Sequence, residues 1–198
     1  MNTVILVAAA YLIGSVSFAV IISRTFRLPD PRSYGSGNPG ATNVLRSGRK
    51  SAAVLTLLGD SIKGWVAVVL ARQFAVPAEI EIAMAAAGVA VVIGHMCPVF
   101  HRFQGGKSVA TALGVLFGFN VYVALGTAAT WIVIAAFFRI SSLAAIVASV
   151  FAPVAMAAMY NPAHPFFYAS LVIAVLLIYR HKANIVKLLA GSESRIGR

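Results

Sequence analysis

Long apolar runs without a charge constrain the fold of this chain more than any other feature. Residues 3–23 and 108–138 contain no Asp, Glu, Lys or Arg over 21 and 31 positions. Shorter apolar runs of 17 to 21 residues lie at 51–71, 82–100, 141–160 and 163–179. A membrane-spanning helix needs about 20 predominantly apolar residues. Each run is therefore long enough, or nearly so, to cross a bilayer as a helix.

The composition excludes the other broad fold classes. Hydrophobic residues make up 60% of the chain and charged residues 11%, whereas a soluble domain carries about 25% charged residues. Such a chain cannot cover a water-facing surface, and it is too apolar to be disordered. None of the runs alternates as a barrel strand would. The sequence predicts an all-α fold, a polytopic membrane bundle with about seven transmembrane helices.

The distribution of the positive charges predicts the topology. Of the sixteen Lys and Arg residues, thirteen lie in three segments, 24–50, 101–107 and 180–198. The positive-inside rule assigns these segments to the cytoplasm, which leaves the N-terminus outside. A net charge of +11 would suggest nucleic acid in a soluble protein. In membrane loops it favours anionic lipid or an anionic substrate, so no nucleic acid partner is expected.

The run 108–138 decides the number of spans. If it crossed once, the C-terminal tail would lie opposite the first basic loop. Thirty-one residues make about 46 Å of helix, which is long for one span and short for two. The sequence Gly118-Phe119-Asn120 offers a break in the middle. We predict two short helices here, seven spans in total, and one membrane-embedded domain over residues 1–198.

Residues 34–46, called the glycine loop below, form the first polar motif. Gly35, Gly37 and Gly40 spell GxGxxG, but a dinucleotide site needs a preceding strand and none is expected here. Glycines and asparagines still let backbone N–H groups converge on an anion, and a helix beginning near Ala41 would add donors. The side chains that would assist are Ser36, Asn38, Asn43 and Arg46. The alternative is an ordinary turn between two helices.

Residues 105–107, called the lysine loop below, form the second motif. Gly105-Gly106-Lys107 opens an apolar run and would seat a phosphate at the start of a helix. His101 stands where a nucleotide P-loop needs glycine, so that assignment is rejected. The alternative for Lys107 is an ordinary interfacial lysine. His95 lies about 7 Å inside the cytoplasmic end of its span, where it would either act on a ligand or bond a neighbouring helix.

Two further groups of polar residues complete the candidate site. His181 and Asn184 share one face of a helix and would address one ligand, unless the tail is a basic amphipathic helix lying on acidic lipid. Asp60 and Lys63 are three apart within an apolar run and are expected to pair. Lys63 would then either face the cytoplasmic site or hold helices in register.

These motifs together resemble the acyl-phosphate:glycerol-3-phosphate acyltransferase (PlsY) family of bacterial membranes. The matching stretches, in chain order, are GSGNPGATNVLR at 35–46, GDSIKG at 59–64, GH at 94–95, GGKSVAT at 105–111 and RHKANI at 180–185. The likeness extends over nearly the whole chain in size, span order and motif order.

The resemblance implies a reaction and a location. An acyl phosphate would give its acyl group to the 1-hydroxyl of glycerol 3-phosphate in the bacterial inner membrane, with the site facing the cytoplasm. Membrane lipid surrounds such an enzyme, and an association with a soluble enzyme that makes acyl phosphate is left open. Neither a cofactor nor a metal ion is expected.

The resemblance also assigns roles to residues. Ser36, His95 and His181 are the expected catalytic residues. Substrate binding is expected of Gly37, Asn38, Asn43, Arg46, Lys63, Gly105, Gly106, Lys107 and Asn184. Ser36 and nearby amides would grip the acyl-phosphate head or the developing oxyanion, and the lysine loop would bind glycerol 3-phosphate. The proton of the attacking hydroxyl would pass to His95, His181 or a substrate phosphate oxygen.

Other functions remain as alternatives. A His-x4-Asp dyad is absent, since Phe100 stands five residues after His95 and none of the other histidines has the aspartate. A covalent role for Ser36 would require a trapped acyl-enzyme. A transporter for a phosphorylated solute would also need intramembrane charges, but it predicts polar groups at both faces. A lipid-binding scaffold predicts basic loops without the Ser, Asn and Gly motifs.

Overall fold

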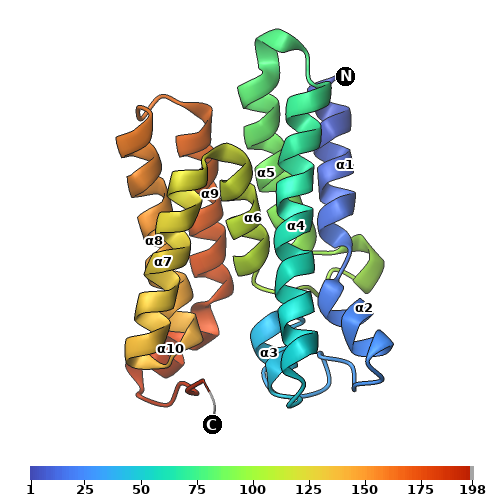
Figure 1. Ribbon diagram of the computed structural model, residues 1–198, viewed down its shortest axis with the longest axis vertical. Coiled ribbons are helices and arrows are strands. Elements are labelled where there is room, and N and C mark those ends of the chain that lie inside the picture. Colours follow the sequence, from blue (N-terminus) through green and yellow to red (C-terminus); the bar gives the residue numbers. More distant parts are fainter. Residues whose placement is uncertain (197–198) are drawn as a thin grey trace. The chain divides into compact units, whose positions relative to one another are not determined.

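The protein is described here by a computed structural model covering residues 1–196; Arg198, the last cation of the basic tail, lies outside the described residues. Over those residues every regular element is helical and no strand occurs (Figure 1). The predicted all-α fold is confirmed. The chain divides into two compact units, Met1–Phe119 and the part from Asn120 onward. The expected single domain stays a prediction, and each unit is treated by itself.

The first unit combines three longer helices with several short ones. Its elements are α1 (Thr3–Ser15), α2 (Phe18–Thr25), α3 (Ala41–Leu45), α4 (Lys50–Phe74), the 3-10 turn η1 (Pro77–Glu79), α5 (Ile80–Met96), η2 (Val99–His101) and α6 (Val109–Phe119). The helix predicted to begin near Ala41 is confirmed as α3. α1 packs on α5, and α4 packs on α6.

Glycines let these helices approach one another closely. A methyl group on Gly14 would collide with the backbone of Val91 on α5, and one on Gly114 would collide with the carbonyl of Ser61 on α4. Small residues at contacts are what membrane helices need, because lipid supplies no hydrophobic drive for association. The glycines of the apolar runs therefore mark where the helices touch.

The first predicted span, 3–23, is interrupted. α1 ends at Ser15, and the hydroxyl of Ser17 accepts a hydrogen bond from the backbone N–H of Val20 to begin α2. The carbonyl oxygens of Gly14 and Val16 both accept hydrogen bonds from Lys63 Nζ, at 3.0 and 2.6 Å. The break thus exposes backbone acceptors to a buried lysine on α4. By length and hydropathy Thr3–Thr25 is still a candidate span.

The second unit contains α7 (Val121–Phe138), α8 (Ser141–Met159), α9 (Pro165–Arg180) and α10 (Lys182–Leu189). α7 packs on α8, and α8 packs on α9. α9 and α10 are bent by 60° relative to each other at His181. The third motif therefore lies at a corner between two helices.

The predicted division of 108–138 into two helices is confirmed. α6 ends at Phe119, and the side-chain oxygen of Asn120 accepts hydrogen bonds from the N–H groups of Tyr122 and Val123 at the start of α7. This is the capping that asparagine performs well. Because α6 has only 11 residues, it is about 16 Å long, roughly half the thickness of the hydrocarbon core.

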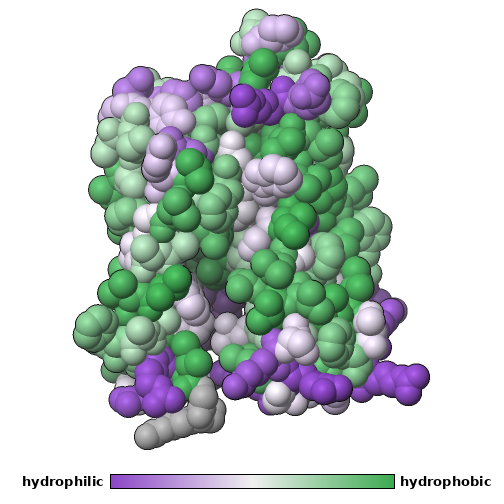
Figure 2. Space-filling model, in the orientation of Figure 1, coloured by the Kyte–Doolittle hydropathy of each residue, from purple (hydrophilic) through white to green (hydrophobic). Residues whose placement is uncertain are grey.

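The helices suit a membrane. Over the described residues, five helices are long and apolar enough to cross, or six if the bent pair α9 and α10 is one span. Hydrophobic side chains cover the lengths of the helices, and hydrophilic ones gather near their ends (Figure 2). The protein is an integral, multi-pass membrane protein. The count of seven crossings and the outward N-terminus stay predictions.

Candidate active site

Asn43 organises the glycine loop from inside. Its side chain is buried, and its Oδ1 accepts a hydrogen bond from the backbone N–H of Ser36 at 2.9 Å. Its Nδ2 donates to the carbonyl oxygens of Pro31 and Tyr34 at 2.6 and 3.1 Å. One amide on α3 therefore fixes the path of the loop. Direct contact of Asn43 with substrate stays a prediction.

Two of the loop's glycines have the left-handed backbone conformation. Gly35 and Gly37 have φ of 60° and 68°, which a residue with a Cβ adopts at a cost. A methyl on Gly35 would also collide with Asn43 Oδ1 and would lie 3.3 Å from Arg46 Nη1. The Arg46 guanidinium therefore lies beside this turn. Ser36, the next residue, is exposed.

The remaining polar groups of the loop are close by. Asn38 Nδ2 donates to the carbonyl of Ser36 at 3.2 Å. Preceding the loop, the Arg32 guanidinium donates to Asp30 Oδ2 at 2.6 Å. That hydrogen bond, supported by the arginine's charge, lowers the pKa of Asp30 to about 2. Arg32 is therefore neutralised by Asp30, and Arg46 is the cation that lies beside Gly35.

The lysine loop lies against both His95 and the glycine loop. Gly105 and Gly106 are buried, and the N–H of Gly106 donates to the carbonyl of His95 at 3.2 Å. A methyl on Gly106 would collide with His95 Nε2 and would lie 2.8 Å from the carbonyl oxygen of Pro39. Only glycine permits this approach. The structure thus brings together two motifs that are some 65 residues apart in the sequence.

A buried cluster of polar side chains lies beneath these loops. We use "buried cluster" for Asp60, Lys63, His95 and Thr111, all at most 7% exposed. His95 Nδ1 lies 3.2 Å from Thr111 Oγ1 and 3.6 Å from Asp60 Oδ1, while Nε2 faces Gly106. Thr111 and Asp60 therefore lie at the Nδ1 side of the ring, and Nε2 is turned toward the lysine loop.

Lys63 is surrounded by acceptors. Its Nζ lies 2.9 Å from Asp60 Oδ1 and donates to the carbonyl oxygens of Gly14 and Val16. The predicted pair with Asp60 is confirmed. An ammonium group has three N–H donors, and three acceptors surround this one. Its contact with substrate stays a prediction.

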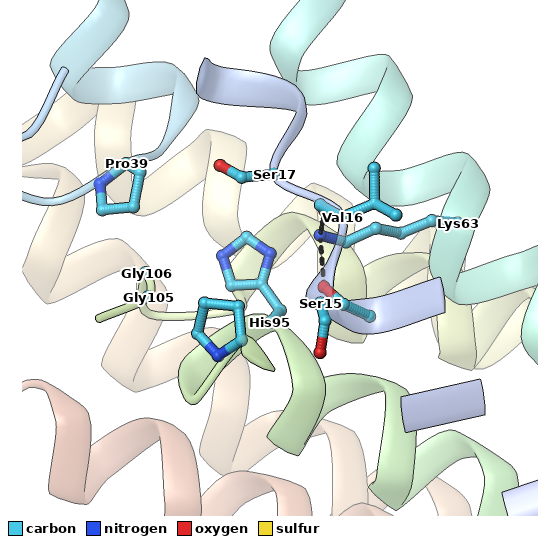
Figure 3. A pocket seen from close by; sticks show the side chains of 10 residues that line it. Ser15, Val16, Ser17, Pro39, Lys63, His95, Gly105 and Gly106 are labelled. Carbon is cyan, nitrogen blue, oxygen red and sulfur yellow. Dashed lines mark hydrogen bonds between the residues drawn. The ribbon is translucent and has the colours of Figure 1, made fainter. Parts of the chain in front are cut away.

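The helix break, the two loops and the buried cluster enclose a small cavity (Figure 3). Its volume is about 10 Å³, roughly one water position. The cavity is too small for a substrate. The lining residues are Gly14, Ser15, Val16, Ser17, Pro39, Lys63, His95, Pro98, Gly105 and Gly106.

The second unit carries the third motif. His181 is buried at the corner between α9 and α10, and its Nδ1 lies 2.7 Å from the carbonyl of Leu177. Since a carbonyl only accepts, Nδ1 carries the hydrogen. Asn184 Nδ2 donates to Glu193 Oε1 at 2.6 Å, and Ser142 Oγ donates to the same oxygen at 2.8 Å. The convergence of this motif with the first two stays a prediction.

Sequence reasoning missed several members of these arrangements. Asp60 was expected to pair with Lys63 but not to approach His95, and Thr111 was not singled out. Glu193, which joins Asn184 to Ser142, was also missed. The signal for Asp60 was present, because an acid within an apolar run is rarely without a function. Nothing in the spacing along the chain indicated the partners of Thr111 or Glu193.

Comparison with known proteins agrees with the motifs. Residues 4–191 match the family described as glycerol-3-phosphate acyltransferase. Proteins named glycerol-3-phosphate acyltransferase from Burkholderia multivorans and Burkholderia pseudomallei are 60% and 57% identical to this chain. The first alignment covers 98% of this chain and 91% of the relative, the second 100% and 97%.

Solved structures give the same result. The chain is similar to a crystal structure of PlsY (YgiH), an integral membrane glycerol 3-phosphate acyltransferase, in its glycerol 3-phosphate form. The TM-score is 0.90 at 40% identity, over 98% of this chain and 96% of that one. The lysophosphatidic acid form of PlsY gives a TM-score of 0.88 at 39% identity, over 98% and 95%. With its motifs, its helices and these matches, the chain belongs to the glycerol-3-phosphate acyltransferase family and is an acyltransferase of phospholipid synthesis.

Proposed function

We propose that the protein transfers an acyl group from acyl phosphate to the 1-hydroxyl of glycerol 3-phosphate. The hydroxyl oxygen attacks the carbonyl carbon of the mixed anhydride, the bond from that carbon to the phosphate oxygen breaks, and the hydroxyl proton leaves. The products are 1-acylglycerol 3-phosphate (lysophosphatidic acid) and inorganic phosphate. The donor is already activated, so no covalent enzyme intermediate is required.

The observation that carries the proposal is the contact between the two glycine-containing loops. Pro39 of the glycine loop and Gly106 of the lysine loop adjoin, with His95 beside both. Each loop has the glycines, N–H groups and cation that suit a phosphate. Two anionic substrates need two such seats next to each other, whereas a scaffold for lipid needs neither.

Electrostatics and positioning would supply the catalysis. Two anions repel, so cations and backbone dipoles must hold them at reacting distance. Arg46 and Ser36, with the amides around Gly37 and Asn38, would hold the acyl-phosphate head. Lys107 with Gly105 and Gly106 would hold glycerol 3-phosphate. Lys63 and Asn43 would support these seats, and His181 and Asn184 would contribute from the second unit.

The destination of the proton distinguishes three mechanisms. His95 Nε2 faces the lysine loop, His181 has its Nδ1 at a carbonyl, and a substrate phosphate oxygen is itself a base. If His95 is the general base, His95→Gln abolishes the acidic limb of the pH–rate profile. If the substrate is its own base, that limb persists in both His95→Gln and His181→Gln.

The family and the distribution of Lys and Arg residues support a membrane location and an orientation. We propose that the protein lies in the bacterial inner membrane with its loops 24–50 and 101–107 facing the cytoplasm, as one domain. The soluble substrate then arrives from the cytosol while the acyl chain of the donor stays in lipid. An association with a soluble enzyme that makes acyl phosphate would fit this arrangement.

The donor is tested with purified protein in detergent and radiolabelled glycerol 3-phosphate. Acyl phosphate, acyl-CoA and acyl carrier protein are offered separately, and labelled 1-acylglycerol 3-phosphate is measured. We expect product with acyl phosphate alone. Turnover with a thioester donor would overturn the donor assignment, and an absence of turnover with all three would favour a transporter of phosphorylated solutes.

The lysine loop is tested by Lys107→Gln. Loss of a charge-assisted hydrogen bond to phosphate should raise the KM for glycerol 3-phosphate about ten- to hundredfold. Lys50→Gln is the matched control, because Lys50 is an exposed cation at the first residue of α4. An equal rise in KM in both variants would mean that only the general charge of the loops matters.

A further inference from the structure

A second cavity lies along the C-terminal part of α4. It has a volume of about 410 Å³, within the size range of sites that bind small molecules. Its lining combines apolar and polar side chains from α4 and α6. The residues are Trp65, Val69, Arg72, Gln73, Phe117 and Gly118.

This cavity lies on a different side of α4 from the candidate active site. Residues 65, 69, 72 and 73 follow the spacing of one helix face. Lys63, which lines the small cavity of the candidate active site, is two residues from Trp65 and nine from Arg72, so it points about 180–200° away around the helix. The second cavity is therefore not part of the site described above.

The apolar side chains of the lining are partly exposed. Trp65 of α4 is 46% exposed and Phe117 of α6 is 37% exposed. α6 ends at Phe119 after 11 residues, so it is too short to cover the whole of α4. Large half-exposed side chains beside a helix end provide a surface suited to an acyl chain.

The lining also includes a cation. Arg72 lies in the last turn of α4 and is exposed, and no hydrogen bond or ion pair of its side chain occurs among residues 1–196. Gln73 adds an exposed amide. A guanidinium matches a phosphate through two parallel hydrogen bonds. Arg72 is about 10 Å along the axis from Trp65, so a phosphate held there would leave an attached chain over the indole.

The length of α4 puts Arg72 at headgroup level. Twenty-five residues make about 37 Å of helix, whereas the hydrocarbon core is about 30 Å thick. The last turn of α4 therefore lies in the interfacial region. If loop 24–50 is cytoplasmic, this is the leaflet facing away from the cytoplasm.

We infer that this cavity binds an anionic glycerophospholipid, with its phosphate on Arg72 and Gln73 and an acyl chain on Trp65 and Phe117. The charge of Arg72 selects an anionic headgroup over a zwitterionic one. The site does not depend on the proposed reaction, because it shares no residue with the two loops or the buried cluster.

The chain's two tryptophans, Trp65 and Trp131, allow a direct test. Trp131→Phe leaves Trp65 as the only indole. The purified variant in detergent is titrated with phosphatidylglycerol carrying dibrominated acyl chains, because bromine quenches tryptophan fluorescence on contact. We expect saturable quenching at lower concentrations than with dibrominated phosphatidylcholine. Excess glycerol 3-phosphate should leave the quenching unchanged.

Substitutions at Arg72 test the headgroup contact. In the Trp131→Phe background, Arg72→Gln should weaken phosphatidylglycerol binding about fivefold, to the level of phosphatidylcholine, and Arg72→Lys should keep most of the preference. Lys182→Gln removes an exposed cation of α10 and should change nothing.

Three results would overturn the inference. The first is quenching that does not saturate, which means that Trp65 contacts only bulk lipid. The second is an equal response to the two lipids in the parent. The third is an equal weakening by Lys182→Gln and Arg72→Gln, which means that the general positive charge attracts the lipid.

Discussion

The glycine loop and the buried cluster both hold polar groups in place, but they do so by opposite means. In the loop one neutral side chain, Asn43, satisfies three backbone groups, and the residues around it are largely exposed. In the cluster, ionisable groups are almost fully buried and lie 2.9 to 3.6 Å from one another. Asn43 fixes backbone shape, whereas the cluster fixes the orientation of the His95 ring.

This difference has an energetic consequence. A neutral hydrogen bond contributes about 1 kcal/mol and can be lost without leaving a charge behind. A buried ion pair contributes little net stability, but removing one partner leaves an uncompensated charge. Removing one charged side chain from the cluster should therefore cause a large loss of stability. In the loop, the loss should scale with the number of hydrogen bonds removed.

The largest effect is expected for Lys63→Met. The substitution leaves the Asp60 carboxylate buried without its cation and removes both donors to the carbonyls of Gly14 and Val16. The expected loss is about 3–5 kcal/mol of unfolding free energy, a fall in Tm on the order of 10 °C. Thermal unfolding of the purified protein in detergent measures it.

The double variant Asp60→Asn with Lys63→Met is the control. It removes both charges together, so most of the lost stability should return. If the double variant melts as low as the single one, the bonds of Lys63 to the two carbonyls, rather than its charge, stabilise the fold.

The next largest effect is expected for Asn43→Ala. Three side-chain hydrogen bonds are lost, about 2–3 kcal/mol in total, and the activity should fall further because Ser36 is no longer held. Asn38→Ala is the matched control, since its side chain donates a hydrogen bond to the carbonyl of Ser36. Thermal unfolding and protease cleavage within residues 34–46 measure the two variants. Equal cleavage of both would show that Asn43 does not organise the loop.

The sequence predicted what depends on local pattern. Runs of apolar residues located the helices, and Gly118-Phe119-Asn120 located the break between α6 and α7, because an asparagine cap is a local signal. The helix predicted near Ala41 and the pairing of Asp60 with Lys63 are local in the same sense. All of these depend on residues within about one or two turns of one another.

The sequence did not predict what depends on distant partners. The break after Ser15 is stabilised by Lys63, nearly 50 positions further on, and the one local signal, the cap residue Ser17, does not predict it within so apolar a run. The place of Thr111 behind His95 likewise depends on how α5 and α6 pack. Such contacts join helices whose registers the hydropathy pattern leaves open.

A smaller effect is expected for Gly37→Ala in the glycine loop. Gly37 has φ of 68°, and the nearest atom to an added methyl is the carbonyl oxygen of Arg32 at 3.7 Å. The expected loss of unfolding free energy therefore comes from backbone strain alone and is about 1–2 kcal/mol. Gly40→Ala adds the same methyl in open space at an extended φ of −160°. Thermal unfolding should show a smaller loss for Gly40→Ala, and an equal or larger loss would contradict the assignment of strain to Gly37.

The smallest effect is expected for the ion pair that precedes the loop. Asp30 and Arg32 are each about a third exposed, so solvent screens the pair, and Asp30→Asn should cost less than about 1 kcal/mol at neutral pH. Because the pKa of Asp30 is lowered from 3.8 to about 2 in the folded protein, this contribution is complete above about pH 5 and is mostly lost by about pH 2. Thermal unfolding of parent and variant between pH 7 and pH 2 measures it. The two curves should converge at the acid end and at high salt, whereas a gap that persists at pH 2 would mean that the carboxylate's charge is not what stabilises this turn.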